Sequence, residues 1–169
     1  VRKGSQTTLF PFLKPEIKLK EYTMIKLITL WFQRAVPKPT DRNFDVQMGC
    51  HFEEVVEMMQ SVKGRNQFSD SMLGQAEGYL KTLADSLKDG TVSVAIGDRK
   101  EFLDSVADQI VTGTGAWHMA GMLGAEAVQR VNTSNWSKFS EDGQPIFNAN
   151  GKIAKNPATY KEVNLDGLY

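Results

Sequence analysis

The chain has 169 residues, of which 41% are hydrophobic and 24% charged; these proportions are typical of a globular protein and exclude a disordered or fibrous chain. Twenty basic residues balance twenty acidic ones, so the zero net charge argues against a general nucleic-acid-binding protein, which needs excess positive charge. One cysteine, Cys50, and two histidines exclude an intramolecular disulfide framework and a Cys/His zinc site within one chain, and they fit a reducing cytoplasm. No apolar run reaches the ~18 residues that a membrane span needs, so we expect no membrane partner.

The first 23 residues differ from the rest of the chain. They contain basic residues and prolines without a sustained hydrophobic period, so we expect a loose arm. The dipeptide Lys20-Glu21 stands shortly before Met24, and one pair of codons for it, AAG-GAG, is a bacterial ribosome-binding sequence. Residues 1–23 are therefore interpreted as either a basic tail or a translated leader before a natural start at Met24, and the codons of the gene distinguish the two.

From Met24 onward, hydrophobic residues recur at helical spacing and predict five helices. Prolines, glycines and capping residues set the expected ends. The predicted helices run from Met24 to before Pro37, from Asp41 or Asn43 to about Val62, from Asp70 or Ser71 to Gly90, from near Asp98 to about Met119, and from Leu123 toward Lys138.

Two segments between and after these helices have other patterns. Residues 91–97 have β-propensity, but a lone strand has no partner, so we expect a connector. Asp142-Gly143 and Asn150-Gly151 are turn dipeptides on either side of residues 145–149, which predicts a small hairpin or an ordered loop. The predicted fold class is all-α, with one helical-bundle domain over residues 24–169 and an irregular C-terminal tail.

The second predicted helix carries three carboxylates on one face. Glu53, Glu54 and Glu57 are separated by helical spacings, opposite the apolar side of the helix, and no lysine or arginine stands four residues away to relieve their repulsion. A solvated acidic face explains such a cluster equally well on this helix alone.

The fourth predicted helix repeats the pattern with Glu101, Asp104 and Asp108. Asp108 lies within an apolar stretch, where a buried carboxylate needs a partner. Since no lysine or arginine occurs between Lys100 and Arg130, the simplest compensating charge is a hard divalent cation, Mg²⁺ or Mn²⁺.

These motifs carry a family resemblance. Glu-Glu-x-x-Glu over 53–57, followed on a later helix by Ala-Asp at 107–108, resembles the all-α nucleoside triphosphate pyrophosphohydrolases, which include MazG, the dimeric dUTPases and phosphoribosyl-ATP pyrophosphohydrolase. Segments 131–139 and 151–160 resemble those of phage and bacterial MazG-like proteins of the phosphoribosyl-ATP pyrophosphohydrolase-like type. The resemblance runs from about Met24 to the C-terminus.

The resemblance implies a helical bundle that binds Mg²⁺ and hydrolyses a nucleoside triphosphate to the monophosphate and pyrophosphate. It makes Glu54 and Glu57 the first pair of metal ligands and Glu53 the candidate base or water-orienting residue. The second pair departs from the family spacing Glu-x-x-Asp, because Ser105 stands three residues before Asp108. Asp104 and Asp108 are the favoured ligands, with Glu101 as a weaker alternative.

Residues of the C-terminal part are candidates for substrate binding. Lysines suit phosphate oxygens, asparagines suit a sugar or base, and an aromatic ring can stack on a base; equally, such lysines are often solvated, asparagines cap helices and aromatic rings pack in the core. The candidates are Lys138, Lys152, Lys155, Asn132, Asn135 and Tyr160.

Other functions stay open from the sequence. One is phosphoribosyl-ATP hydrolysis in histidine synthesis, and another is a non-catalytic helical oligomerisation or regulatory protein. We also expect a homo-oligomer, a dimer or tetramer, because several large apolar side chains exceed what one small bundle covers and because Gly113 and Gly115 would let helices of two subunits approach. The expected location is the cytoplasm, of a bacterium or of a host if the gene belongs to a phage.

Overall fold

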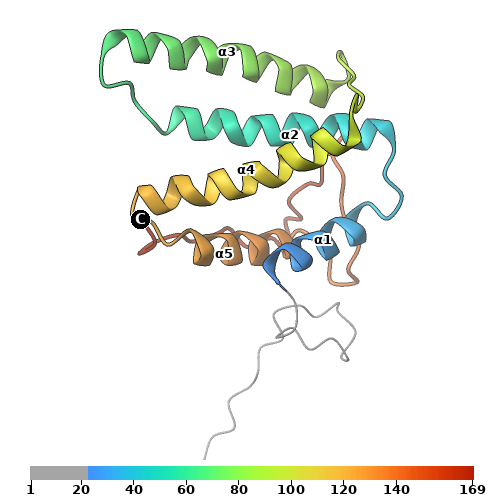
Figure 1. The fold of residues 1–169 in the computed structure, drawn as a ribbon. Coiled ribbons are helices and arrows are strands. Elements are labelled where there is room, and N and C mark those ends of the chain that lie inside the picture. Colours follow the sequence, from blue (N-terminus) through green and yellow to red (C-terminus); the bar gives the residue numbers. More distant parts are fainter. Residues whose placement is uncertain (1–22) are drawn as a thin grey trace, which may run out of the picture. The chain divides into compact units, whose positions relative to one another are not determined.

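A computed structural model describes residues 23–169, so nearly all of the predicted arm or leader over 1–23 lies outside the described residues. The described part contains helices and irregular segments but no strand, which confirms the all-α fold class (Figure 1). The helices are α1 (Met24–Ala35), α2 (Asp41–Gln60), α3 (Gln67–Asp89), α4 (Arg99–Met119) and α5 (Gly124–Trp136). Within residues 23–169, none of these helices has both the length and the apolar character needed to cross a bilayer.

The chain divides into two compact units. Among the described residues, unit 1 contains 23–37, 98–146 and 153–169, and therefore α1, α4 and α5. Unit 2 contains 38–97 and 147–152, and therefore α2, α3 and a short piece of the C-terminal tail.

Side-chain caps decide where the helices of unit 2 begin. Thr40 caps α2, and Asn43 takes part as the third helical residue, whose side chain accepts from the Thr40 backbone N–H. Asn66 caps α3 in the same way with Ser69. The prediction placed the start of α3 about four residues too late, because Ser69 is not the Glu or Gln usually expected at that position. The end of α3 at Gly90 is confirmed, with φ of 91°.

Unit 2 is a pair of helices that lie side by side along their length, α2 against α3 (Figure 1). Val46, Val56, Ala84 and Leu87 are buried between them. Gly49 marks the closest approach, because a Cβ atom there would lie 2.8 Å from the Ala84 carbonyl oxygen and 2.8 Å from Cγ of a lysine on α3. The absence of a side chain at this position therefore sets the distance between the helices.

The segment after α3 is a connector, as the sequence predicts. Buried Asp45 on α2 accepts a hydrogen bond of 2.9 Å from the backbone N–H of Val94, which fixes the connector without a second strand. Its carboxylate thus satisfies a backbone donor that an isolated extended segment would leave to water.

Unit 1 has its core where α1 lies beside the end of α5 (Figure 1). Trp31, Ala35, Trp136 and Phe139 form one buried cluster. The indole N–H of Trp31 donates a 2.8 Å hydrogen bond to the backbone carbonyl of Asn135, so the ring is held by a polar contact as well as by packing.

Helix α4 differs from the other four helices, because none of its residues is buried. Leu103 is 72% exposed and Met119 is 85% exposed, so these apolar side chains of α4 are not covered within unit 1. Gly113 and Gly115 have open space at the position of a Cβ atom. The close approach in this unit occurs instead at Gly124, whose Cβ would lie 2.1 Å from the Trp117 ring.

A glycine comparison tests the helix pairing of unit 2. Gly49→Ala should lower the free energy of unfolding relative to Gly78→Ala by about 1–3 kcal/mol, because overpacking at position 49 displaces the α3 backbone, whereas Gly78 has open space on α3. Both changes gain the same helix propensity, about 1 kcal/mol, so their difference isolates packing. Urea unfolding followed by circular dichroism measures it, and equal effects of the two substitutions would contradict the close approach.

Candidate functional site

Unit 2 brings together two residues that the sequence analysis assigns to separate tasks, Glu53 and Lys152. The Lys152 ammonium donates to Oε2 of Glu53 at 2.7 Å. A third residue, Lys88 of α3, donates to Oε1 at 2.6 Å. We call Glu53, Lys88 and Lys152 the charge clamp, because one carboxylate joins ammonium groups from two separate segments.

The packing of α2 on α3 places the first half of the charge clamp. Gly49 allows α3 to come into contact with the turn of α2 that contains it. Glu53 lies one helical turn further along α2. Lys88 therefore reaches Glu53 from the last turn of α3, and it also pairs with Asp85 at 3.0 Å.

A tight turn over residues 148–152 places the second half. The Asn148 side chain accepts from the backbone N–H groups of Asn150 and Lys152, and the Asn148 N–H donates to the Lys152 carbonyl at 2.9 Å. Gly151 adopts φ of 81°, which favours glycine. This confirms the predicted ordered loop, and the turn presents Lys152 to α2.

Charge and burial have opposite effects on the groups of the clamp. Partial burial by itself would raise the pKa of Glu53, but hydrogen bonds from Lys152 and Lys88 outweigh it and hold the pKa below its ordinary value. Burial would lower the pKa of each lysine, but the bonds to Glu53 raise both above the ordinary value. Burial raises the pKa of the neighbouring Cys50 thiol, although Lys152 opposes that shift.

The other two carboxylates of α2 have a different environment. Glu54 and Glu57 are both exposed, and within residues 23–169 no hydrogen bond or ion pair engages their carboxylates. Their separation of three residues puts them on neighbouring positions of one helix face. Oxygen ligands of this kind suit Mg²⁺ chemically.

The predicted ligands of α4 are also exposed. Asp104, Asp108 and Glu101 have solvent-accessible side chains, and in the described part of the chain no hydrogen bond or ion pair engages the carboxylates of the first two. The expectation that Asp108 is buried was wrong, because the apolar residues around it on α4 are themselves exposed. Across residues 23–169, no three or more histidine, cysteine, aspartate or glutamate side chains gather closely enough to hold a metal ion. The favoured ligands therefore form two separate pairs, Glu54 with Glu57 on α2 and Asp104 with Asp108 on α4.

The remaining substrate-binding candidates lie in unit 1 and have local roles there. Asn132 is buried, 3% exposed, and the backbone of Asn135 accepts from the core tryptophan. The Lys138 ammonium lies 5.9 Å from the centre of that tryptophan ring. Lys155 lies 4.7 Å from the ring centre of Tyr160, so these two candidates contact each other.

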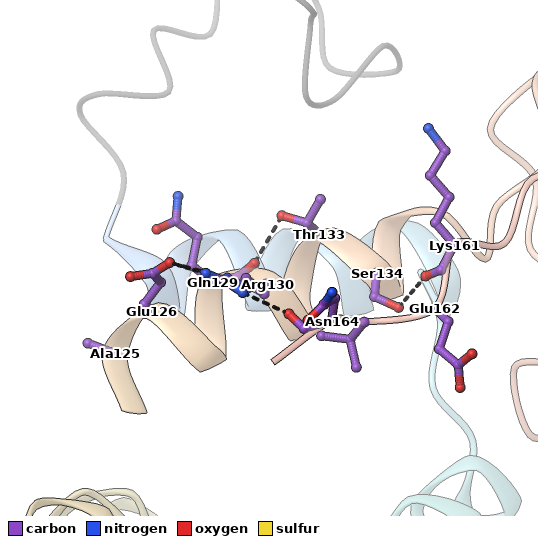
Figure 2. A pocket seen from close by; sticks show the side chains of 10 residues that line it. Ala125, Glu126, Gln129, Arg130, Thr133, Ser134, Lys161, Glu162 and Asn164 are labelled. Carbon is purple, nitrogen blue, oxygen red and sulfur yellow. Dashed lines mark hydrogen bonds and ion pairs between the residues drawn. The ribbon is translucent and has the colours of Figure 1, made fainter. Parts of the chain in front are cut away.

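Unit 1 also has an open groove of about 760 Å³ between α5 and residues 161–164 (Figure 2). Ser134 donates to the Lys161 carbonyl at 2.7 Å, which fastens the C-terminal segment to α5. Arg130 donates to Glu126 and to the Asn164 carbonyl, so its guanidinium is occupied by the protein itself. The groove thus lies where two segments pack together, and its Arg130 side chain is already paired within the protein.

Sequence reasoning missed the partners that make Glu53 unlike its neighbours. Lys88 stands 35 residues from Glu53 and Lys152 stands 99 residues away, so no local pattern joins them. Arg42 was missed as well; it donates to the carbonyls of Leu87 and Lys88 at the end of α3. The glycine at position 49, on the face toward α3, was the available signal for close packing.

Comparison of the chain with protein-family models, with curated proteins and with solved structures gave no match.

Removal of the Glu53 charge should change stability in a pH-dependent way. Glu53→Gln should lower the free energy of unfolding by about 1–2 kcal/mol at neutral pH, because two partly exposed ammonium pairs lose their carboxylate. Since the folded-state pKa of Glu53 is lowered, this contribution is complete above the ordinary value of 4.5 and is lost as the pH falls through the folded-state pKa. Since the lysine pKa values are raised, it is complete below 10.5 and is lost as the pH rises through the folded-state values.

Urea unfolding across pH 3 to 11 measures the difference between wild type and Glu53→Gln, which should be largest between about pH 5 and 10. The matched control is Glu54→Gln, which removes a carboxylate from the next residue without breaking an ion pair and should change stability by less than about 0.5 kcal/mol. A difference between wild type and Glu53→Gln that stays constant from about pH 3 to 11 would contradict the charge clamp.

Proposed function

We propose that this chain is an Mg²⁺-dependent nucleoside triphosphate pyrophosphohydrolase of the all-α type that its motifs resemble, acting in the cytoplasm on a nucleotide, with a deoxynucleoside triphosphate as the first candidate. The observation that supports it is the environment of the carboxylates. Glu54 and Glu57 on α2, and Asp104 and Asp108 on α4, are exposed, and within residues 23–169 no ion pair compensates them. A helix that keeps acidic groups together without cations loses free energy by repulsion, and a bound cation removes that loss.

The donor chemistry of these four residues fits the proposed metal. All four present carboxylate oxygens, which hard cations prefer to nitrogen or sulfur. When bound, Mg²⁺ neutralises phosphate charge and lowers the pKa of coordinated water. The chain's own contribution is to supply the ligands from helices, whose backbones hold the spacing of each pair fixed.

The lysines of unit 2 support a triphosphate as the substrate class. Lys152 is 44% exposed at its side chain and lies in the same unit as Glu54 and Glu57, so this unit offers a cation for phosphate oxygens as well as carboxylates for a metal ion. Hydrolysis of a phosphoanhydride depends mainly on charge neutralisation and positioning, and both need such groups.

Two alternatives make different predictions. Hydrolysis of phosphoribosyl-ATP uses the same chemistry on a larger substrate, so a panel containing it and the deoxynucleoside triphosphates separates these activities by rate. A non-catalytic oligomerisation or regulatory protein releases no pyrophosphate from any of them with Mg²⁺ present.

Neutralising one ligand of each pair tests the function directly. Glu54→Gln and Asp108→Asn should each lower pyrophosphate release by at least about a hundredfold, because each removes a metal ligand from an exposed position while the helical circular dichroism stays unchanged. Glu141→Gln, which removes an exposed carboxylate in the turn after α5, is the control and should keep the wild-type rate. Wild-type rates in both ligand variants at saturating Mg²⁺ would sink the metal-site assignment.

We further propose that the protein is a homo-oligomer, a dimer or tetramer, in which α4 is covered by another subunit. Leu103 and Val111 are 72% and 67% exposed on this helix, and Gly113 and Gly115 leave room for a close neighbour. Large exposed apolar side chains on a helix without a buried face are typical of an interaction surface.

Light scattering at micromolar concentration should give a multiple of 18.9 kDa. Val111→Lys should reduce that mass, because a charge on α4 would be buried in the contact. Tyr79→Lys, at an 81% exposed position on α3, should leave it unchanged. A mass of 18.9 kDa with full activity would exclude the oligomer.

A further inference from the structure

The turn over residues 148–152 is fastened to the helix pair at two points. Lys152 binds Glu53 on α2, and the Asn150 carbonyl accepts from Arg42 at 3.4 Å. Arg42 also binds the end of α3 through the Leu87 carbonyl at 2.6 Å. A short piece of the C-terminal tail is therefore held on unit 2 by charged side chains rather than by a buried apolar face.

Glu53 is the member of the clamp that joins all three segments. Its two oxygens are both taken, one by an α3 lysine and one by the lysine of the turn. Both ammonium groups, at 2.6 and 2.7 Å, stabilise the charged carboxylate, so taking up a proton from water would weaken two ion pairs at once. Its neighbours Glu54 and Glu57 carry no such pair in the described part of the chain, so the three glutamates of the motif are not equivalent.

We propose that Glu53 is a positioning residue, which holds the 148–152 turn on α2 and α3 and orients Lys152 toward a phosphate-bearing substrate, and that it is not the proton acceptor. This assignment rests on the proposed function for its role in the reaction, whereas the clamp itself is a property of the fold.

Lys88 and Lys152 differ in how far their side chains are buried, which suits them to different roles. The Lys88 side chain is 15% exposed and also binds Asp85, so it serves as the fixed anchor of Glu53. The Lys152 side chain is 44% exposed, which leaves part of its ammonium group open to an anion while one hydrogen bond to Glu53 fixes its direction. A lysine fixed in this way loses less conformational entropy when it binds phosphate than a free one does. Loss of Glu53 should therefore weaken substrate binding through Lys152.

Hydrogen exchange tests the clamp without any substrate. In wild type, the backbone N–H groups of Asn148, Gly151 and Lys152 are hydrogen-bonded within the turn. Glu53→Gln and Lys152→Met should each raise their exchange rates by about tenfold, because the turn opens more often when its anchor is lost. Lys152→Arg should keep the protection, and Glu54→Gln and Lys161→Met are the controls that should leave it unchanged. Unaltered protection in Glu53→Gln would overturn the clamp.

Kinetics separates positioning from proton transfer. A positioning role predicts that Glu53→Gln and Lys152→Met both raise KM by about tenfold with a smaller change in kcat, and that the double variant is no worse than either single one. The acidic limb of the pH–rate profile should persist in Glu53→Gln. A large loss of kcat in Glu53→Gln with no acidic limb, together with a normal Lys152→Met enzyme, would identify Glu53 as the base and overturn the assignment.

The two proposals fail in different ways. A wild-type protein that hydrolyses no triphosphate overturns the proposed function and the role of Glu53 in it, while the exchange rates still decide whether the clamp exists. An active wild type with a normal KM in Glu53→Gln and Lys152→Met overturns the positioning role alone.

Discussion

The close packing of α2 on α3 at Gly49 is the constraint on which the candidate site depends. A side chain at this position would meet the Ala84 backbone, so glycine sets the distance between the helices. At this distance Lys88 reaches across to Glu53 one turn further on, and the turn that carries Lys152 completes the arrangement. Moving the helices apart by the width of one methyl group would lengthen the contact between Lys88 and Glu53, now 2.6 Å, and a charged hydrogen bond weakens steeply with distance.

The environment of each carboxylate decides what it can do chemically. Two cations hold Glu53 in its charged form, and these ion pairs stabilise the fold. Glu54 and Glu57 sit on the same helix with their oxygens toward solvent, which leaves them available to a cation from outside the protein. Within one helical turn, Glu53 therefore stabilises the fold, whereas Glu54 and Glu57 remain for the proposed metal chemistry.

Helix α4 raises a second physical question, because a helix with no buried residue gains little from the hydrophobic effect inside its own chain. Its N-terminus is stabilised locally, since the Asp98 side chain accepts from the backbone N–H groups of Lys100 and Glu101. Trp117, packed over Gly124, ties its other end to α5. The exposed apolar residues between these ends are the physical basis for proposing a second subunit.

Local sequence patterns were enough to predict the helices. Periodicity, prolines and caps predicted five helices, and those predictions are confirmed apart from the early start of α3, because helix signals act over three or four residues that the sequence shows directly. Helical spacing likewise places three glutamates on one helix face. The pairing of Glu53 and the exposure of Asp108 could not be read from the chain, because both depend on distant residues: Lys88 and Lys152 in the first case, and the lack of packing on α4 in the second. Charge pairs formed across 35 and 99 residues depend on how helices and turns meet, and no spacing rule within one helix contains that information.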